Sequence, residues 1–162
     1  MNISVRKFCE SDVAKVNEIW NEVVKDGRAF PQIECLDDIT GKEFFLSQSY
    51  TGIAENENGE IVGLYILHPN NVGRCSHICN ASYAVKSGLR GEGIGEKLVC
   101  DCIKIAPKFG FKILQFNAVV KSNKAALHLY KKLGFTPLGT IPKGFMLDSG
   151  EYEDIIPHYI EV

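Results

Sequence analysis

The sequence predicts one mixed α/β domain in which seven strands and four helices follow in the order β-α-α-β-β-β-α-β-α-β-β. Segments with apolar residues at helical spacing and short segments rich in β-branched residues succeed one another along the 162 residues. Turn residues separate these segments, and no repeat, linker or low-complexity run interrupts them. A chain of this length can bury a substantial core, so residues 1–162 are expected to form a single domain.

The composition and net charge of the chain indicate which partners and which cellular location to expect. Hydrophobic residues make up 45% and charged residues 23% of the chain, and the formal net charge is −2, which gives no general reason to expect nucleic acid or an anionic membrane as a partner. No stretch approaches the ~18 apolar residues of a membrane span, and the first residues do not resemble a secretion signal. We therefore expect a cytoplasmic protein whose six cysteines are reduced.

The first third of the chain predicts an edge strand and two helices. Ile3–Phe8 is predicted to form the strand, and apolar residues at helical spacing from Ser11 to Val24 predict the first helix. The irregular segment 26–38 contains Phe30-Pro31 and can wall a pocket. Thr40-Gly41-Lys42-Glu43 has the spacing of a capping box, which predicts a short helix from there to Ser49.

The middle of the chain predicts three strands. Asn56-Glu57-Asn58-Gly59 supplies the turn of a hairpin between strands Thr51–Glu55 and Glu60–Leu67. Residues 68–73 break the pattern, and Ser76–Val85 resumes as a strand.

The last part predicts two helices, each preceded by a strand, and a closing hairpin. One helix follows a glycine-rich stretch and reaches Lys108, and a strand at Phe111–Val120 leads to a helix capped by Ser122 and ended by Gly134. Gly139–Leu147 and Glu151–Ile160 then form a hairpin, whose edge can support a homodimer.

The glycine-rich stretch Arg90-Gly91-Glu92-Gly93-Ile94-Gly95 lies between a strand and a helix. Alternating glycines let the backbone approach a ligand closely, and the helix start offers unpaired N–H groups, which together suit a phosphate. A dinucleotide fingerprint would need glycine where Glu96 stands, and a Walker loop would need Gly-Lys-Ser/Thr at its end. Both nucleotide loops are excluded.

The remaining pattern, Gln/Arg-x-x-Gly-x-Gly/Ala, fits this stretch. Together with Asn-Lys-Ala-Ala-Leu-His-Leu-Tyr-Lys-Lys-Leu-Gly-Phe from Asn123 to Phe135, it resembles the GCN5-related N-acetyltransferase (GNAT) superfamily over nearly the whole chain. The resemblance implies the GNAT fold, with a mostly antiparallel sheet of six or seven strands, and acetyl-CoA as acyl donor. It also implies that the sheet splays between Ser76–Val85 and Phe111–Val120, opening a slot for the pantetheine arm.

The resemblance assigns roles to individual residues. It implies that loop amides hold the coenzyme pyrophosphate, that the strand ending at Tyr83-Ala84-Val85 binds the pantetheine arm, and that Asn123 contacts the coenzyme. The residues expected to bind coenzyme are Tyr83, Ala84, Val85, Arg90, Gly91, Gly93, Ile94, Gly95, Glu96, Asn123 and Tyr130. Lys131 and Lys132 can steer the 3′-phosphate or be solvated helix charges.

Acetyl transfer needs a proton for the departing thiolate, and Tyr130 matches the usual general acid of the family. A phenol stays protonated at neutral pH, although Tyr130 also lies on a helix face that can pack in the core. Asn80 and Asn117, on the two splayed strands, can hold the acceptor or can serve only in strand hydrogen bonding. The general base stays open among Glu34, Asp37, Asp38 and a water.

A metal is not expected. Cys75, His77 and Cys79 are of the residue types that bind zinc. However, residues i and i+4 of a strand lie ~13 Å apart, too far to share one ion. The segment from Pro69 to Asn80 resembles a GNAT branch that includes fungal enzymes acetylating proline analogues.

The sequence therefore predicts an N-acetyltransferase that moves an acetyl group from acetyl-CoA to a primary or secondary amine of a small molecule. The alternatives are acetylation of a protein or peptide amine, and a non-catalytic acyl-CoA-binding domain.

Overall fold

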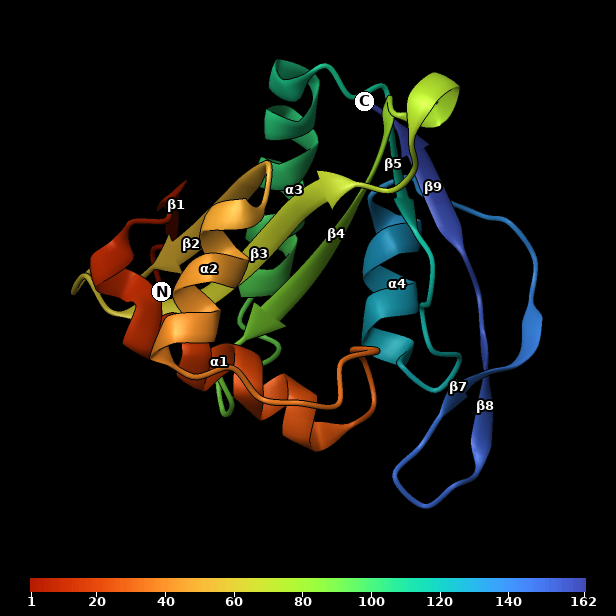
Figure 1. Ribbon diagram of the computed structural model, residues 1–162, viewed down its shortest axis with the longest axis horizontal. Coiled ribbons are helices and arrows are strands. Elements are labelled where there is room, and N and C mark those ends of the chain that lie inside the picture. Colours follow the sequence, from red (N-terminus) through yellow and green to blue (C-terminus); the bar gives the residue numbers. More distant parts are fainter.

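A seven-stranded sheet forms the centre of the computed structural model, which describes all 162 residues (Figure 1). The strand order is β1-β2-β3-β4-β5-β9-β6, and every neighbouring pair is antiparallel except β4 with β5. The strands are β1 (Ser4–Lys7), β2 (Tyr50–Glu55), β3 (Ile61–Pro69), β4 (Ile78–Val85), β5 (Ile113–Phe116), β6 (Thr136–Pro137) and β9 (His158–Glu161). The predicted mixed, mostly antiparallel α/β fold is confirmed.

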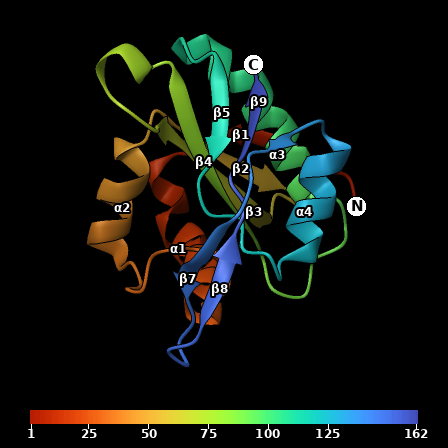
Figure 2. The same ribbon diagram turned by 90° about the vertical axis from the view of Figure 1, so that its right-hand side faces the viewer.

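Four helices cover the two faces of the sheet (Figure 2). On one face lie α1 (Val13–Asp26) and α2 (Asp38–Ser47), and on the other α3 (Ile94–Ile105) and α4 (Lys124–Lys132). Trp20 and Phe45 fill the first core, where the Trp20 ring also packs at a tilt against Phe30, and Leu98 and Cys102 of α3 fill the second. Alternate side chains of the central strands serve the two cores, as a sheet covered on both faces requires.

Strands β4 and β5 pair only at their first residues. Ile78 lies opposite Ile113 and Cys79 opposite Leu114, and no further pair follows. From Asn80 onward the two strands diverge, as Figure 1 shows below the start of β5. The predicted strand Phe111–Val120 is therefore shorter than expected, because its second half leaves the sheet on one side of a gap.

The chain end also differs from the prediction. The segment Glu151–Ile160 is not one strand but two, β8 (Tyr152–Ile155) and β9, separated at Ile156-Pro157. Strand β8 pairs with β7 (Ile141–Met146) in a separate two-stranded sheet, whereas β9 inserts between β5 and β6 of the main sheet. Proline has no N–H for a ladder, which explains a break at this point.

Two helix starts differ from the predicted caps. Asp37, and not Thr40, caps α2: its carboxylate accepts from the N–H groups of Ile39 and Thr40, and the Thr40 hydroxyl accepts from the Asp37 N–H. Asn123 caps α4, whereas the Ser122 hydroxyl donates to Glu153. Both predictions identified the right kind of signal but placed it on the wrong residue.

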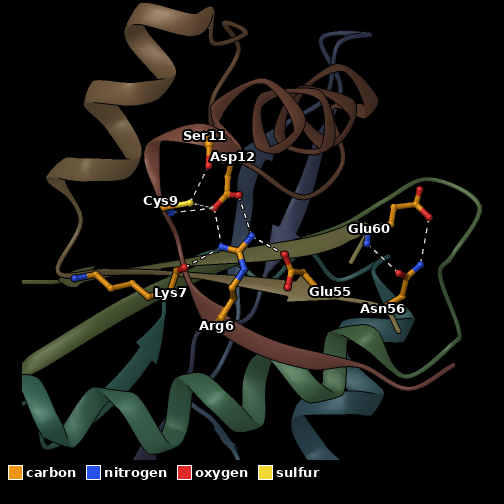
Figure 3. Close-up of polar contacts among 8 residues, drawn as sticks. All are labelled: Arg6, Lys7, Cys9, Ser11, Asp12, Glu55, Asn56 and Glu60. Atoms are coloured by element: carbon orange, nitrogen blue, oxygen red, sulfur yellow. Dashed lines mark hydrogen bonds and ion pairs between the residues drawn. The ribbon is translucent and has the colours of Figure 1, made fainter. Parts of the chain in front are cut away.

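Polar contacts tie the edge strand β1 to its neighbours (Figure 3). The Arg6 guanidinium donates two hydrogen bonds to Asp12, at 2.8 and 2.9 Å, and one to Glu55 on β2, at 2.5 Å. Asp12 ends a 3₁₀ turn, Glu10–Asp12, and also accepts from the Cys9 N–H. These bonds fix the direction in which α1 leaves the sheet.

A glycine and a tyrosine on β2 and β3 hold α3 against the sheet. Gly52 lies opposite Tyr65, and a Cβ at residue 52 would stand 2.1 Å from the Tyr65 ring. The ring thus occupies the space that glycine leaves, and its hydroxyl donates to Asp101 on α3 at 2.8 Å.

None of the helices is long and apolar enough to cross a membrane.

Candidate active site

A cavity of about 610 Å³ opens where β4 and β5 part. It runs from the turn before α3, past α4, to the segment that joins α1 to α2. Its walls are mainly apolar, with a few polar side chains and backbone groups, as in many small-ligand sites. The predicted residues that line it are Asn80, Tyr83, Val85, Arg90, Gly91, Gly93, Ile94, Gly95, Glu96, Asn117, Asn123 and Tyr130.

The register of β4 decides which backbone groups face the gap. At the two ends of the β3–β4 ladder, the Asn70 N–H donates to the Ile78 C=O and the Lys86 N–H donates to the Val62 C=O. Antiparallel pairs alternate between bonded and non-bonded residues, so the even-numbered residues of β4 bond to β3 and the odd-numbered ones point toward β5. Tyr83 and Val85 lie beyond the last β4–β5 pair, which leaves their amide and carbonyl groups for a ligand.

The same register turns Ala84, which was expected to bind coenzyme, away from the gap. Its backbone groups point to β3, opposite Leu64, and its methyl group is buried in the core beneath α1 and α2. Among the residues expected to bind coenzyme, Ala84 is the one that does not line the cavity. Two facts explain this: the backbone groups of the even-numbered residues of β4 bond to β3, and the Ala84 methyl group is enclosed in the core.

The turn before α3 forms an open cradle at one end of the cavity. Gly91 and Gly93 have φ of 88° and 79°, in the left-handed region where a Cβ is costly. Gly93 is the N-cap residue of α3, and no side chain caps this helix. The first N–H groups of α3 are therefore free, and together with the helix dipole they suit an anion.

Tyr130 reaches the cavity from α4. Its ring packs on Phe116, with centroids 4.6 Å apart, and near Phe135 at 5.3 Å. Its hydroxyl has no hydrogen-bond partner within the protein and is not sealed from the cavity. Burial raises the pKa of the Tyr130 hydroxyl above its usual value, so this side chain remains a proton donor over the whole physiological range.

Asn123 stands where α4 begins. Its side-chain oxygen accepts from the Ala126 N–H at 3.2 Å, which fixes the helix start and leaves the side-chain NH₂ group for the cavity that Asn123 lines. One residue thus caps a helix and faces the candidate ligand.

Asn80 on β4 and Asn117, the residue that follows β5, both line the cavity. The Asn80 oxygen accepts from the Ala81 N–H at 2.8 Å. The Asn117 oxygen accepts from Asn70 and from Gln115, each at 3.1 Å, while its NH₂ group donates to Asn70 at 2.6 Å. The side-chain oxygen of each asparagine therefore accepts hydrogen bonds within the protein, and at least one N–H of each NH₂ group is left to donate to a ligand.

The charged groups of the cavity gather at the glycine turn. Arg90 is exposed and makes no ion pair, and Glu96 in the first turn of α3 pairs with Lys132 at 2.7 Å. The three acids considered as general base, Glu34, Asp37 and Asp38, do not line the cavity. Hydrogen bonds from Thr40 and Ile39 also lower the pKa of Asp37, which makes it a poor base.

The cavity contains features that sequence reasoning missed. Ser82 lies beside Asn80 on β4, and Phe116, Val119 and Leu129 supply apolar wall. Period-2 alternation through Asn80 would have identified Ser82, but the apolar residues look like ordinary core in sequence. Phe30-Pro31, predicted as pocket wall, lines the cavity, and Phe30 also belongs to the core beneath α1 and α2.

A buried hydroxyl near the cavity has no partner. The hydroxyl of Tyr83 is sealed from solvent and makes no hydrogen bond within the protein, and burial raises its pKa well above the usual value. Its ring packs between Tyr65 and Phe116, at centroid distances of 5.9 and 5.7 Å. The Tyr83 backbone, rather than its hydroxyl, faces the gap.

Known proteins share this sequence pattern and fold. The chain is 40% identical over 81 residues to N-acetyltransferase aca1 of Schizosaccharomyces pombe, a match covering 50% of this chain and 39% of that protein. It is 26% identical over 145 residues to the L-amino acid N-acyltransferase MnaT of Escherichia coli, covering 87% and 84% of the two chains. This chain thus spans about two fifths of the fungal protein but most of the bacterial one.

A solved structure shows the same fold. The phosphinothricin acetyltransferase Pat from Sinorhizobium meliloti, determined in complex with acetyl-CoA, superposes with a TM-score of 0.91 at 18% identity, covering 100% of this chain and 89% of that one. Residues 16–135, which include the glycine turn, the diverging strands and α4, match the model of the acetyltransferase (GNAT) family. The match covers well over half of the sequence, and the chain belongs to the acetyltransferase (GNAT) family.

Proposed function

We propose that this protein is an N-acetyltransferase that transfers the acetyl group of acetyl-CoA to a primary or secondary amine of a small molecule. The observation that carries the proposal is the single cavity that joins an anion cradle, a strand edge with free amides and a buried phenol. A diphosphate, an amide-containing arm and a thioester fit these three parts in that order.

The cradle fits the diphosphate of coenzyme A. Free N–H groups at the start of α3 can accept it, and the positive φ of Gly91 and Gly93 keeps Cβ atoms away from it. Arg90, which has no ion pair, can add charge-assisted bonds. Tyr83 and Val85 can pair with the amides of the arm as a partner strand would.

The same residues can carry the chemistry. The acceptor must approach as a neutral amine, whose nitrogen attacks the thioester carbonyl. The Val85 N–H points into the gap and can stabilise the oxyanion that develops there. As the carbon–sulfur bond breaks, Tyr130 can donate its proton to the departing thiolate, because burial keeps its hydroxyl protonated. The proton that the attacking nitrogen must lose can pass to water, since Glu34, Asp37 and Asp38 do not line the cavity.

The acceptor is expected to enter from the face of the sheet that α1 and α2 cover. Side chains of the even-numbered β4 residues point to this face, as the burial of Ala84 in that core shows. Asn80 and Ser82 share it, and Phe30 and Pro31 close the cavity there. This side of the cavity carries amides, a hydroxyl and apolar groups but no charged residue, and the names of MnaT and Pat favour a small acceptor.

Release of coenzyme A across a panel of amines tests the proposal. Free thiol would be followed with purified protein, acetyl-CoA and amino acids, polyamines, aminoglycosides or short peptides, with a reaction lacking amine as the blank. We expect release with at least one small amine and recovery of its N-acetyl product by mass spectrometry. Release with peptides alone would replace the proposal with a protein acetyltransferase, and tight acetyl-CoA binding without release would indicate a non-catalytic domain.

A further inference from the structure

An ion pair joins the two helices that flank the coenzyme cradle. Glu96 lies in the first turn of α3 and lines the cavity, and Lys132 is the last residue of α4. Their charged groups are 2.7 Å apart. The pair therefore joins the end of α4 to the first turn of α3, where a diphosphate is proposed to bind.

The position of Glu96 is unfavourable for that ligand. The free N–H groups of α3 and the exposed Arg90 favour an anion at this point, whereas a carboxylate in the same turn repels one. Two like charges a few Å apart at a protein surface repel appreciably, because solvent screens them only in part. A cation held against Glu96 removes most of this repulsion.

Stabilisation of the fold does not account for the pair. The side chains of Glu96 and Lys132 are 38% and 55% exposed, and ion pairs this open contribute little to folding. The neighbouring Lys131, also in the last turn of α4, makes no ion pair, so a place near the C-terminus of a helix is not what fixes Lys132.

We propose that Lys132 is a positioning residue of the coenzyme site, which neutralises Glu96 and holds its carboxylate away from the diphosphate. The inference rests on the proposed function, since it requires that coenzyme A binds at the cradle. Lys132 acts through Glu96 and not by touching the ligand. Removing the lysine alone should therefore weaken binding, and removing both charges should restore it.

Calorimetric titration with acetyl-CoA tests this without any acceptor. Lys132→Met should raise the Kd roughly tenfold at low ionic strength, and less in higher salt because the repulsion is screened. Glu96→Gln should bind as tightly as the wild type or more tightly. The double variant should return to within about twofold of Glu96→Gln. Lys108→Met is the matched control, because it removes one exposed lysine beyond the far end of α3 and should leave the Kd unchanged.

Each outcome has a distinct meaning. Unchanged affinity in Lys132→Met, with a wild type that binds acetyl-CoA, would overturn the inference and leave the proposed function standing. A double variant as weak as Lys132→Met would also overturn it, since Lys132 would then contact the coenzyme directly. A wild type that does not bind acetyl-CoA would refute the proposed function itself. Thermal unfolding midpoints within a few degrees of wild type would show that the variants fold.

Discussion

The side-chain amides of Asn70 and Asn117 form a reciprocal hydrogen-bonded pair between the β3–β4 loop and the residue that follows β5. Gln115 donates a third bond to the Asn117 oxygen, at 3.1 Å. An amide whose oxygen accepts two bonds has a fixed orientation, so Asn117 turns its remaining N–H toward the cavity. This orientation depends on a residue 47 positions earlier in the chain.

Asn70→Ala should therefore impair acceptor binding. Without its partner the Asn117 amide can rotate, and we expect the KM for the acceptor to rise about fivefold, the worth of one hydrogen bond of ~1 kcal/mol. The kcat and the Kd for acetyl-CoA should stay near wild-type values. Asn71→Ala is the control, because the Asn71 side chain bonds only to the adjacent Val72 N–H. Equal loss in both variants would point to general disturbance of the loop.

Tyr130→Phe tests the general acid. Loss of the proton donor should lower kcat by roughly 10² or more, while acetyl-CoA binding changes little because the ring still packs on Phe116. The raised pKa of Tyr130 means that this acid is fully protonated below pH 10, so a fall in kcat below that pH would have another origin. Steady-state rates from pH 6 to 10 provide the measurement. Tyr152→Phe, an exposed tyrosine on β8, is the control. A variant with undiminished kcat would remove Tyr130 from this role.

The sequence predicted the fold well because its strongest signals are local. Apolar spacing from Val13 to Val24 and the glycine turn before Ile94 each depend on neighbours within a few residues, and both elements lie where expected. The same is true of the turn at Asn56-Gly59 between β2 and β3. Element order follows from such signals, and with it the fold class.

The errors arose where tertiary pairing decides. Nothing between Phe111 and Val120 indicates that β5 ends at Phe116, because that end is set by the last pair with β9, Phe116 opposite His158. The position of Ala84 away from the cavity was unpredictable for a similar reason, because the backbone groups of β4 that face the gap depend on register with β3. The Asn70–Asn117 and Glu96–Lys132 contacts, 47 and 36 residues apart, were beyond reach of a local pattern.

Gly93→Val tests the cradle. Gly93 has a φ of 79° and no neighbour within 4 Å of a Cβ at that position, so the variant should still fold, with a strain cost of ~1–2 kcal/mol. A branched side chain in the cradle should abolish detectable acetyl-CoA binding in a calorimetric titration.

The variant Gly59→Val distinguishes the effect of backbone strain from the effect of a side chain in the cradle. Gly59 has a nearly identical φ of 76° and equally open surroundings, but lies in the β2–β3 turn. Its variant should lose similar stability and keep normal acetyl-CoA affinity. Similar affinity loss in both would mean that backbone strain, and not the cradle, controls binding.

The substitution Asp12→Asn should make the free energy of unfolding less sensitive to pH in the acid range. The hydrogen bonds from Arg6, more than that from the Cys9 N–H, hold the pKa of the Asp12 carboxyl below its usual value. A carboxyl whose pKa is lower in the folded protein stabilises the fold above its unfolded pKa of ~3.9, and this contribution fades as pH falls through the folded value. At pH 7 the variant should lose ~2 kcal/mol, less than a fully buried pair would, since the Arg6 side chain is 36% exposed.

Urea unfolding at pH 7 and at steps below pH 4 measures this effect. The gap between wild type and Asp12→Asn should narrow as pH falls below 4, because protonation removes the same charge from the wild type. Glu18→Gln breaks the exposed pair with Lys15 and should leave the free energy of unfolding nearly unchanged at every pH. A constant gap between wild type and Asp12→Asn down to pH 2 would show that shape, and not the charge on Asp12, holds α1 to β1.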